Sequence, residues 1–243
     1  MRYIFLALTL VAFISTSAQE QIFKPTLSYF PSIHPDSIAL FEQQKKDFND
    51  IAERRIEYDK TSAYHRYLME NEMHFYNDAF STSEEGCSWY CAGGPSEITA
   101  TSSLKSQGKN SYKAENLHDF TLKTAWVEGQ PGLGIGEEVT FEFKMNKVLK
   151  VTTLEIYNGY CKNLNTWKAN GRVKSFGLYI NGEYKGKLSL RDTYHCQRFK
   201  IGSFGCHKDE PMTISLKITE VYAGDKYEDV AISEINFDGT GDH

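Results

Sequence analysis

An acid and a hydroxyl group lie close together in the polar stretch AENLHDFTLKTAWVEG, residues 114–129. Asp119 can supply a carboxylate, and Thr124 a carbonyl and a hydroxyl oxygen, which are ligands that a hard cation such as Ca²⁺ prefers. Trp126 follows two residues after Thr124 and predicts an anchor in a β core. In the alternative interpretation Asp119 caps backbone amides, and hydrogen bonds alone order the loop.

A second chemically capable stretch is NGYCKNLNTWKANGRVK, residues 158–174, between two predicted strands. Sugar recognition needs an aromatic face for C–H groups and planar polar groups for hydroxyls. Trp167 is predicted to be the stacking platform. The predicted contacts around it are Asn158, Tyr160, Asn170 and Arg172. The alternative is structural, with Trp167 filling one end of the core and Arg172 pairing with a carboxylate.

Motifs of common catalytic centres are missing from the sequence. It has no Gly-x-Ser-x-Gly elbow and no His-Glu-x-x-His pair. The glycines of residues 132–136 lead into a predicted strand, so the helix N-terminus that a phosphate site needs is missing. Glu137 and Glu138 are neighbours in that strand and point to opposite faces, which makes a poor acid/base pair. His118 is predicted to be a hydrogen-bonded loop residue, and the chain is predicted not to be an enzyme.

The N-terminus has the pattern of a signal peptide. Arg2 precedes an apolar run, Ile4–Ile14, and small residues lead to a predicted cleavage after Ala18. The run is too short to span a membrane, and no other segment is a candidate. Loss of Arg2 takes the formal charge from −5 to −6, that is −5 minus 1, which does not favour nucleic acid or anionic membranes. Residues 1–18 therefore predict a secreted, periplasmic or cell-envelope protein.

The cysteines of an exported chain predict disulfides, with one thiol left over. Cys196 and Cys206 flank a short glycine-containing segment and are predicted to staple a hairpin. Cys87 and Cys91 are predicted to close the CSWYC loop. Cys161 would then be unpaired, although other pairings stay open.

A zinc site is the alternative use of two of these cysteines. The dipeptides His195-Cys196 and Cys206-His207 could present four ligands. They lack the Cys-x-x-Cys spacing of zinc knuckles, and export favours oxidation, so disulfides are the preferred prediction.

Residues 19–80 predict a helical N-terminal extension. Ile38, Phe41 and Phe48 recur at helical spacing after Pro35, and an aromatic-rich stretch with the same spacing follows up to residue 80. These faces are expected to pack on each other or on the following domain, and a protein partner that docks on residues 34–80 is the alternative. Residues 81–94 predict a cysteine-containing linker.

Residues 95–239 predict a mainly β domain. Eight strands are predicted near Ile98–Leu104, Glu137–Phe143, Val151–Tyr157, Val173–Ile180, Lys185–Leu190, Gln197–Ile201, Met212–Val221 and Val230–Phe237. Asn181-Gly182 between two of them predicts a two-residue hairpin. The 15 Tyr, 15 Phe and 3 Trp of the chain also favour a β-rich fold. The predicted architecture is an antiparallel jelly-roll β-sandwich.

Several of these motifs, in their order along the chain, resemble those of discoidin-like, galactose-binding-type β-sandwiches. They are ENLHDFTLKTAWVEG, GIGE, NGYCKNLNTWKANGRVK and ISEI. More specifically, residues 95–239 resemble the glycan-binding translocation domain of bacterial NAD-glycohydrolase toxins. The resemblance implies an exported, non-catalytic, lectin-like bacterial protein that binds a glycan or polysaccharide. It covers neither the helical extension nor an NAD-glycohydrolase catalytic domain.

The resemblance also implies a structural calcium ion in the opening loop. Asp119 and Thr124 would hold it from the loop, and Glu234 from the last strand. The family pattern usually has Gly after the acid, where this chain has Phe120.

Two functions are therefore expected from the sequence. The first is carbohydrate binding by the sandwich. The second is a structural or protein-interaction module in which residues 34–80 dock a partner.

Overall fold

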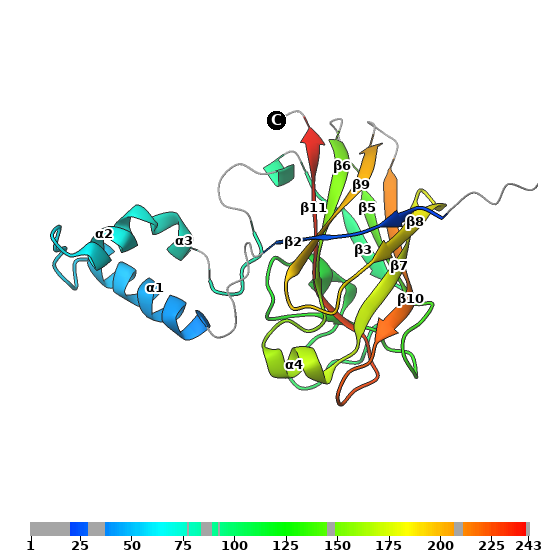
Figure 1. Cartoon of the computed structure of the whole chain (residues 1–243), viewed down its shortest axis with the longest axis horizontal. Helices are drawn as coiled ribbons and strands as arrows, with labels where there is room; N and C mark the ends of the chain where they lie inside the picture. The colour runs from blue at the N-terminus through cyan, green and yellow to red at the C-terminus, as the bar shows by residue number, and fades with distance from the viewer. Residues whose placement is uncertain are drawn as a thin grey trace, which may run out of the picture.

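The computed structural model describes residues 20–28, 37–76, 78–83, 89–91, 93–144, 149–206 and 211–241. Within these ranges the chain forms two facing β-sheets, and a group of helices lies to one side of them (Figure 1). The predicted signal peptide, residues 1–18, lies outside the described residues. No helix in the described ranges is long and apolar enough to cross a membrane.

The two sheets have six and five strands. The first has the order β1 (Ile22–Phe23), β8 (Glu183–Ser189), β7 (Arg172–Ile180), β10 (Met212–Tyr222), β5 (Glu138–Phe143) and β3 (Glu97–Ala100). The second has the order β2 (Thr26–Ser28), β9 (Cys196–Cys206), β6 (Leu149–Asn158), β11 (Ala231–Gly241) and β4 (Trp126–Val127). The strand pairs are antiparallel except β1 with β8. The predicted mainly β fold, an antiparallel sandwich, is confirmed.

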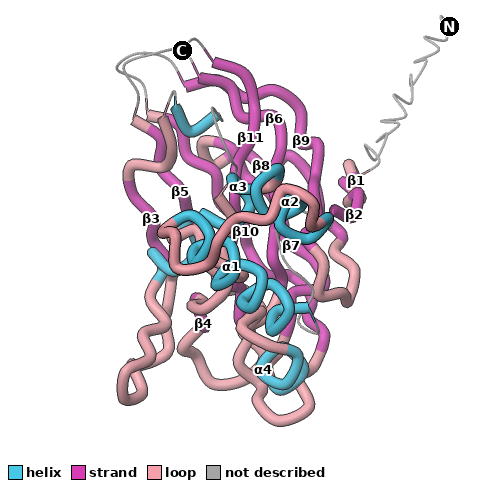
Figure 2. Tube along the Cα trace, turned by 90° about the vertical axis from the view of Figure 1, so that its left-hand side faces the viewer, coloured by secondary structure: helices cyan, strands magenta, loops and turns pink. Residues whose placement is uncertain are grey.

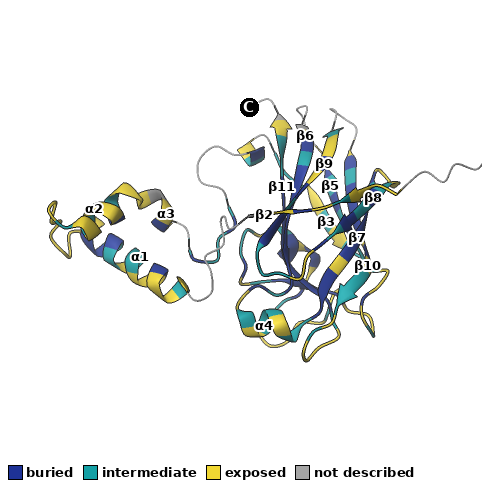
Figure 3. Cartoon of the chain, viewed as in Figure 1, coloured by how far each residue is buried: buried dark blue, intermediate teal, exposed yellow. Residues whose placement is uncertain are grey.

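The core lies between the sheets because alternate residues of each strand point inward. On β5, Val139, Phe141 and Phe143 are buried while their neighbours are partly exposed. Trp126 on β4 is fully buried and belongs to the same cluster. Each large side chain buried in this way stabilises the fold by about 1.5–3 kcal/mol. In Figure 3 the buried residues, in dark blue, lie along the strands of the sandwich.

All eight predicted strands are present, as β3 and β5 to β11. The predicted hairpin is also present between β7 and β8. Asn181 and Gly182 have φ values of 50° and 77°, as a two-residue turn with both central residues in the left-handed region requires.

Residues 20–28 correct the predicted extent of the helical extension, because they form β1 and β2. These strands add to the free edges of β8 and β9, one in each sheet. Gly186 of β8 allows the close approach, since a Cβ there would lie 2.4 Å from the carbonyl oxygen of Gln21. Pro25 separates the two strands, so each is too short to give a recognisable alternation in the sequence.

The segment predicted as a linker contributes to the core of the sandwich. Trp89, in the short helix η2 (Trp89–Cys91), is only 6% exposed, and its ring lies 6.3 Å from that of Phe143. The hydroxyl of Tyr90 accepts a 2.6 Å hydrogen bond from the N–H of Phe237 on β11. The packed core therefore begins before residue 95.

The predicted helices are α1 (Ile38–Ala52), α2 (Ala63–Glu70) and α3 (Glu72–Tyr76). They bury a cluster of their own around Phe41, Phe48, Leu68 and Phe75. Figure 2 looks at the helices from their own side, with the sandwich behind them. The helical extension is thus a small packed unit beside the sandwich.

A short antiparallel contact joins this unit to the opening loop of the sandwich. Residues 78–82 run beside residues 120–123, where the N–H of Leu122 donates to the carbonyl of Phe80 at 2.9 Å. The ammonium group of Lys123 lies 5.1 Å from the centre of the Phe80 ring. The helices therefore meet the sandwich at the same loop that carries Asp119.

The predicted Cys196–Cys206 disulfide is wrong. The two cysteines are the first and last residues of the single strand β9, roughly 30 Å apart at the usual rise per residue. Cys196 is a free, fully buried thiol. The zinc alternative fails for the same reason, and His207 lies outside the described residues. The predicted partner of Cys91, Cys87, also lies outside them, so that pair stays a prediction.

Candidate functional site

The three residues predicted to hold a cation lie together where the opening loop meets β11. The 3₁₀ helix η3 (Ala114–His118) ends at Asp119, whose Oδ2 accepts a 2.6 Å hydrogen bond from the hydroxyl of Thr124. Glu234 is fully buried, and its Oε2 accepts the N–H of Thr121 at 3.2 Å. Loop and last strand are therefore joined through the Glu234 carboxyl group.

Phe120 shapes the loop that surrounds this carboxyl group. It has a φ of 58°, in the left-handed region, and follows Asp119 at φ −111° and ψ 10°. Successive residues of this kind point their N–H groups into one concave site for an anion. The N–H groups of residues 119–121 interact with Glu234 in this way. Phe120 thus keeps the conformation that Gly would favour, and its ring lies 4.6 Å from that of His118.

Burial dominates the charge state of the cluster. It raises the pKa of Glu234 well above 4.5, and the negative charge of Asp119 raises that pKa further. Burial also raises the pKa of Asp119. Burial lowers the pKa of His118 to about 4, so His118 is neutral at pH 7. Its Nδ1 therefore carries a proton and donates to the carbonyl of Ile235 at 2.9 Å, as predicted for a hydrogen-bonded loop histidine.

The donor set of this cluster fits a calcium ion. Asp119, Thr124 and Glu234 offer oxygen atoms, and a divalent cation would relieve the repulsion between the two carboxylates. Oε1 of Glu234 is buried without a hydrogen-bond partner, which leaves it available as a ligand. Among the described residues no three His, Cys, Asp or Glu side chains are grouped for a metal, so hydroxyl and carbonyl oxygens would have to complete the shell.

Three of the residues predicted to contact a glycan instead hold their own loop together. Trp167 lies in α4 (Leu164–Ala169), and its Nε1 donates to the carbonyl of Asn158 at 2.8 Å. The guanidinium of Arg172 lies 4.8 Å from the centre of the Trp167 ring and makes two hydrogen bonds to Asp192, at 3.0 and 2.9 Å. Asn158 is 1% exposed and bonds to the backbone of Val173 on both sides of its amide. The side chains of Trp167, Arg172 and Asn158 therefore stabilise the loop, which agrees with the structural alternative for this stretch.

Tyr160 and Asn170 do line a hollow, which has a volume of about 220 Å³. It lies at the α4 end of the sandwich and is lined by residues in the ranges 104–112, 160–170 and 227–229, together with Val127 of β4. Clefts that enclose drug-sized ligands measure about 300–1,000 Å³, so this hollow suits a single small ring.

The lining of this hollow combines aromatic and polar groups. Tyr112, Tyr160 and Tyr227 supply aromatic surface, and Tyr227 is 44% exposed. The amide and charged side chains around them are Gln107, Asn110, Lys162, Asn170 and Asp229. Burial raises the pKa of Asp229, with a further contribution from the negative charge of Glu228. Such a set can stack on an apolar ring face and both donate and accept hydrogen bonds.

Tyr112, Tyr227 and Asp229 are not marked as site residues by any motif in the sequence. They lie in loops that are remote from residues 158–174 along the chain, and only the sandwich topology brings them together. The run DKYED, residues 225–229, shows an aromatic residue among charges between two strands. This run is a local sequence signal for that side of the hollow.

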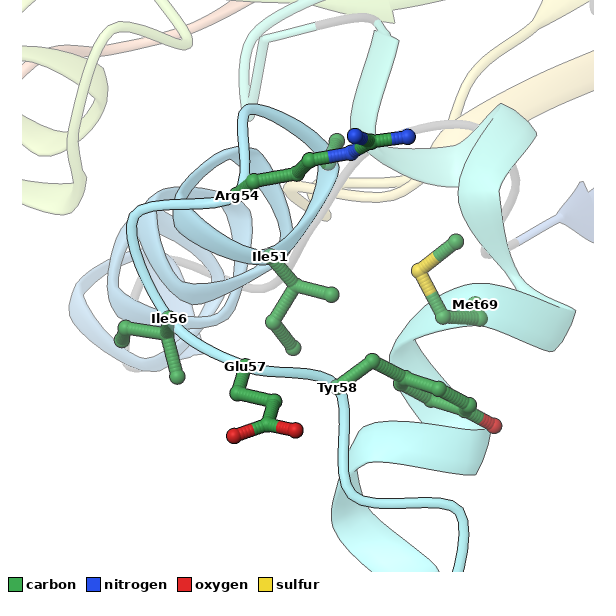
Figure 4. A pocket seen from close by; sticks show the side chains of 7 residues that line it. Ile51, Arg54, Ile56, Glu57, Tyr58 and Met69 are labelled. Atoms are coloured by element: carbon green, nitrogen blue, oxygen red, sulfur yellow. The ribbon is translucent and has the colours of Figure 1, made fainter.

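A second hollow, of about 700 Å³, lies in the helical extension between the end of α1 and α2 (Figure 4). Figure 4 labels the side chains around it: Ile51, Arg54, Ile56, Glu57, Tyr58 and Met69. Ile56 and Tyr58 are each 43% exposed, so apolar surface at this hollow is open to solvent.

The fold has similar solved structures at low sequence identity. A carbohydrate-binding module of Clostridium perfringens, CpGH89CBM32-5 in complex with GalNAc-β-1,3-galactose, is 14% identical, with a TM-score of 0.42 over 59% of this chain and 94% of that one. The C-terminal domain of a chitobiase from Bacteroides fragilis is 17% identical, with a TM-score of 0.43 over 60% and 95%. CBM32-3 from a family 31 glycoside hydrolase of Clostridium perfringens is 13% identical, with a TM-score of 0.42 over 60% and 92%. No protein with curated annotation matches the chain.

A family model matches most of the sandwich, without β1 and β2. Residues 89–238, from the buried Trp89 to the last strand, match the NAD glycohydrolase translocation F5/8 type C domain. The match includes the opening loop, the residues that line the 220 Å³ hollow and most of β11. This chain belongs to the NAD glycohydrolase translocation F5/8 type C domain family.

Proposed function

We propose that this protein is an exported, non-catalytic glycan-binding protein and that the tyrosine-lined hollow at the α4 end of the sandwich is its binding site. The observation that carries the proposal is the lining of that hollow, in which Tyr112, Tyr160 and Tyr227 lie among amide and charged groups. Membership in a family of carbohydrate-binding or translocation modules agrees with it.

The size and chemistry of the hollow favour a terminal sugar unit. A volume of about 220 Å³ is small for an extended chain of sugars. Tyr227 is exposed enough to stack on the C–H face of a ring, while Asn170 and Asp229 can bond to its hydroxyls. The loop around Trp167 would hold Tyr160 and Asn170 in place.

A glycan array followed by calorimetry with galactose-type and glucosamine-type sugars tests this site. Tyr227→Ala is expected to weaken binding about tenfold, since an aromatic stacking contact contributes about 1.5 kcal/mol. Tyr184→Ala is the matched control, because Tyr184 on β8 is also 44% exposed and does not line the hollow. A folded wild type that binds no glycan, or binding that survives Tyr227→Ala unchanged, would overturn the proposal.

A structural calcium ion in the opening loop is part of the same proposal. Asp119, Thr124 and Glu234 would hold it, and the orphaned Oε1 of Glu234 supports this assignment. The bound ion would neutralise the two carboxylates and tie the opening loop to β11.

A second candidate function is protein docking on the helical extension. The hollow of about 700 Å³ and the exposed Ile56 and Tyr58 favour it. Removing the N-terminus up to residue 95 would be a poor test, because it would also delete β1, β2 and the buried Trp89. In the full chain, loss of a captured protein with Ile56→Asp but not with Tyr184→Ala would support docking. Equal capture by both variants would exclude this surface.

A further inference from the structure

Two cysteines that were predicted to be separate lie in the same buried cluster. Cys161 and Cys196 are both fully buried thiols, packed with Leu122 and Tyr157. Cys161 follows the end of β6, and Cys196 begins β9, its antiparallel neighbour. The thiols are therefore brought to one end of the same strand pair.

Contacts on both sides hold the two cysteines in this arrangement. Ile156 of β6 faces Gln197 of β9, and the hydroxyl of Tyr157 interacts with the thiol of Cys196. The hydroxyl of Tyr194, two residues before Cys196, donates to the carbonyl of Cys161. The segment that ends at Cys196 is thus bonded directly to the backbone of Cys161.

The chain turns back toward this cluster immediately after β6. Gly159 has a φ of 96°, and a Cβ there would lie 2.6 Å from Trp167, so glycine is required for the turn. The N–H of Cys161 then donates to the hydroxyl of Ser233 at 2.8 Å. The turn and this hydrogen bond hold Cys161 in the protein interior, where its thiol is fully buried.

The protonation of the thiols determines when they can react. Burial raises the pKa of Cys161 to about 12. Burial also raises the pKa of Cys196, and the charges of Glu155 and Cys161 raise it further. Because the thiolate is the reactive form, the folded dithiol is inert toward exchange, and any pairing must be made while the chain folds.

We propose that Cys161 and Cys196 form a disulfide when the chain folds in the presence of a thiol–disulfide oxidant. The two S–H bonds and the S–S bond of one oxidised glutathione break, and one protein S–S bond forms. The two electrons and two protons pass to the glutathione sulfurs, which leave as two molecules of glutathione. The pairing replaces the predicted Cys196–Cys206 bond and gives Cys161 a partner.

The bond would act on the proposed binding site. Tyr160 and Lys162, which line the 220 Å³ hollow, flank Cys161 in the sequence. A covalent link from Cys161 to β9 would fix the base of this loop. This consequence rests on the proposed glycan function, whereas the disulfide itself does not.

Refolding the full chain with oxidised glutathione or with dithiothreitol tests the pairing. Each sample is denatured without reductant, alkylated with iodoacetamide and mapped by peptide mass. After oxidised refolding we expect the peptides of Cys161 and Cys196 to be joined, with the loss of two hydrogens and no alkylation at either site. We also expect the oxidised protein to melt roughly 10 °C higher, because the bond closes a loop of roughly 35 residues.

Single variants separate this pair from other pairings. Cys161→Ser should leave Cys196 open to alkylation, and Cys196→Ser should do the same for Cys161. Cys91→Ser should leave the link unchanged. Full alkylation of both sites in oxidised wild type, or a bond from either one to another cysteine, would overturn the proposal. The wild-type peptide map gives that answer even if a variant does not fold, and it is independent of whether any glycan binds.

Discussion

Replacing Glu234 by Gln is expected to change how the stability of the protein depends on pH. Burial and the neighbouring Asp119 hold the pKa of Glu234 well above 4.5, so the folded chain keeps a proton that the unfolded chain loses. The free energy of unfolding therefore falls as the pH rises above 4.5, by about 1.4 kcal/mol per pH unit until Glu234 ionises. Gln cannot ionise and can still accept the N–H of Thr121, so this slope should disappear.

His118 acts in the opposite direction and makes the expected pH profile distinctive. Because burial lowers its pKa from 6.5 to about 4, the unfolded chain binds a proton there that the folded chain does not. That contribution to stability is present above pH 6.5 and is lost as the pH falls to about 4. In the wild type the two slopes offset each other between pH 4.5 and 6.5. In Glu234→Gln the Glu234 slope is absent, so between pH 4.5 and 6.5 stability should rise more steeply with pH than it does in the wild type.

Urea unfolding followed by tryptophan fluorescence at pH 5–8, with EGTA present, measures both profiles. The new amide adds an offset of about 1 kcal/mol that does not vary with pH, so the difference in slope is the informative quantity. Glu183→Gln is the control, since the Glu183 side chain is 76% exposed and should leave the profile unchanged. Parallel profiles for wild type and Glu234→Gln would refute a protonated, buried Glu234.

Three further outcomes follow from the loops of the sandwich. Millimolar Ca²⁺ should raise the melting temperature of the wild type but not that of Glu234→Gln, and an equal response in differential scanning calorimetry would exclude the proposed ion. Gly159→Ala should destabilise the fold more than Gly182→Ala in urea unfolding, because both glycines have positive φ but only at Gly159 would a Cβ lie within 3 Å of other atoms. An equal loss of stability in the two variants would mean that neighbouring atoms shift to relieve the clash at residue 159. Trp167→Phe should cost about 1–2 kcal/mol of stability through its lost hydrogen bond. It should leave glycan affinity within a few fold, and a tenfold loss in calorimetry would instead place Trp167 in the binding site.

Much of the sandwich could be predicted from the sequence because its strands are regular. β5 alternates strictly, with Val139, Phe141 and Phe143 inward, and Asn181-Gly182 fits only a tight turn. β9 shows the limit of such reasoning. Gly202 and Gly205 between Cys196 and Cys206 suggested a turn, but the strand continues through them with an irregular register against β6. A glycine within a strand can equally mark a bulge, and only its partner strand decides between the two.

The candidate site was less predictable because its contacts depend on the backbone. Trp167 has the residue type of a stacking platform, yet its Nε1 donates to the carbonyl of Asn158. A backbone acceptor has no residue-type signature, so no sequence pattern could reveal that bond. Asp119 and Glu234 are the opposite case. Glu234 lies in an otherwise apolar strand, where burying an acid without partners is costly. Its position there indicates that a polar segment, the opening loop, supplies its hydrogen-bond partners.

The short strands β1 and β2 have a consequence for how the molecule is made. Ile22 pairs with Lys187, so β1 cannot join its sheet until a partner about 165 positions later in the chain is available. Synthesis must therefore be almost complete before either sheet edge can be closed, and such long-range pairing slows folding. A chain whose sheet edges close this late would also suit the proposed export, because a chain that has not yet folded can be threaded through a channel.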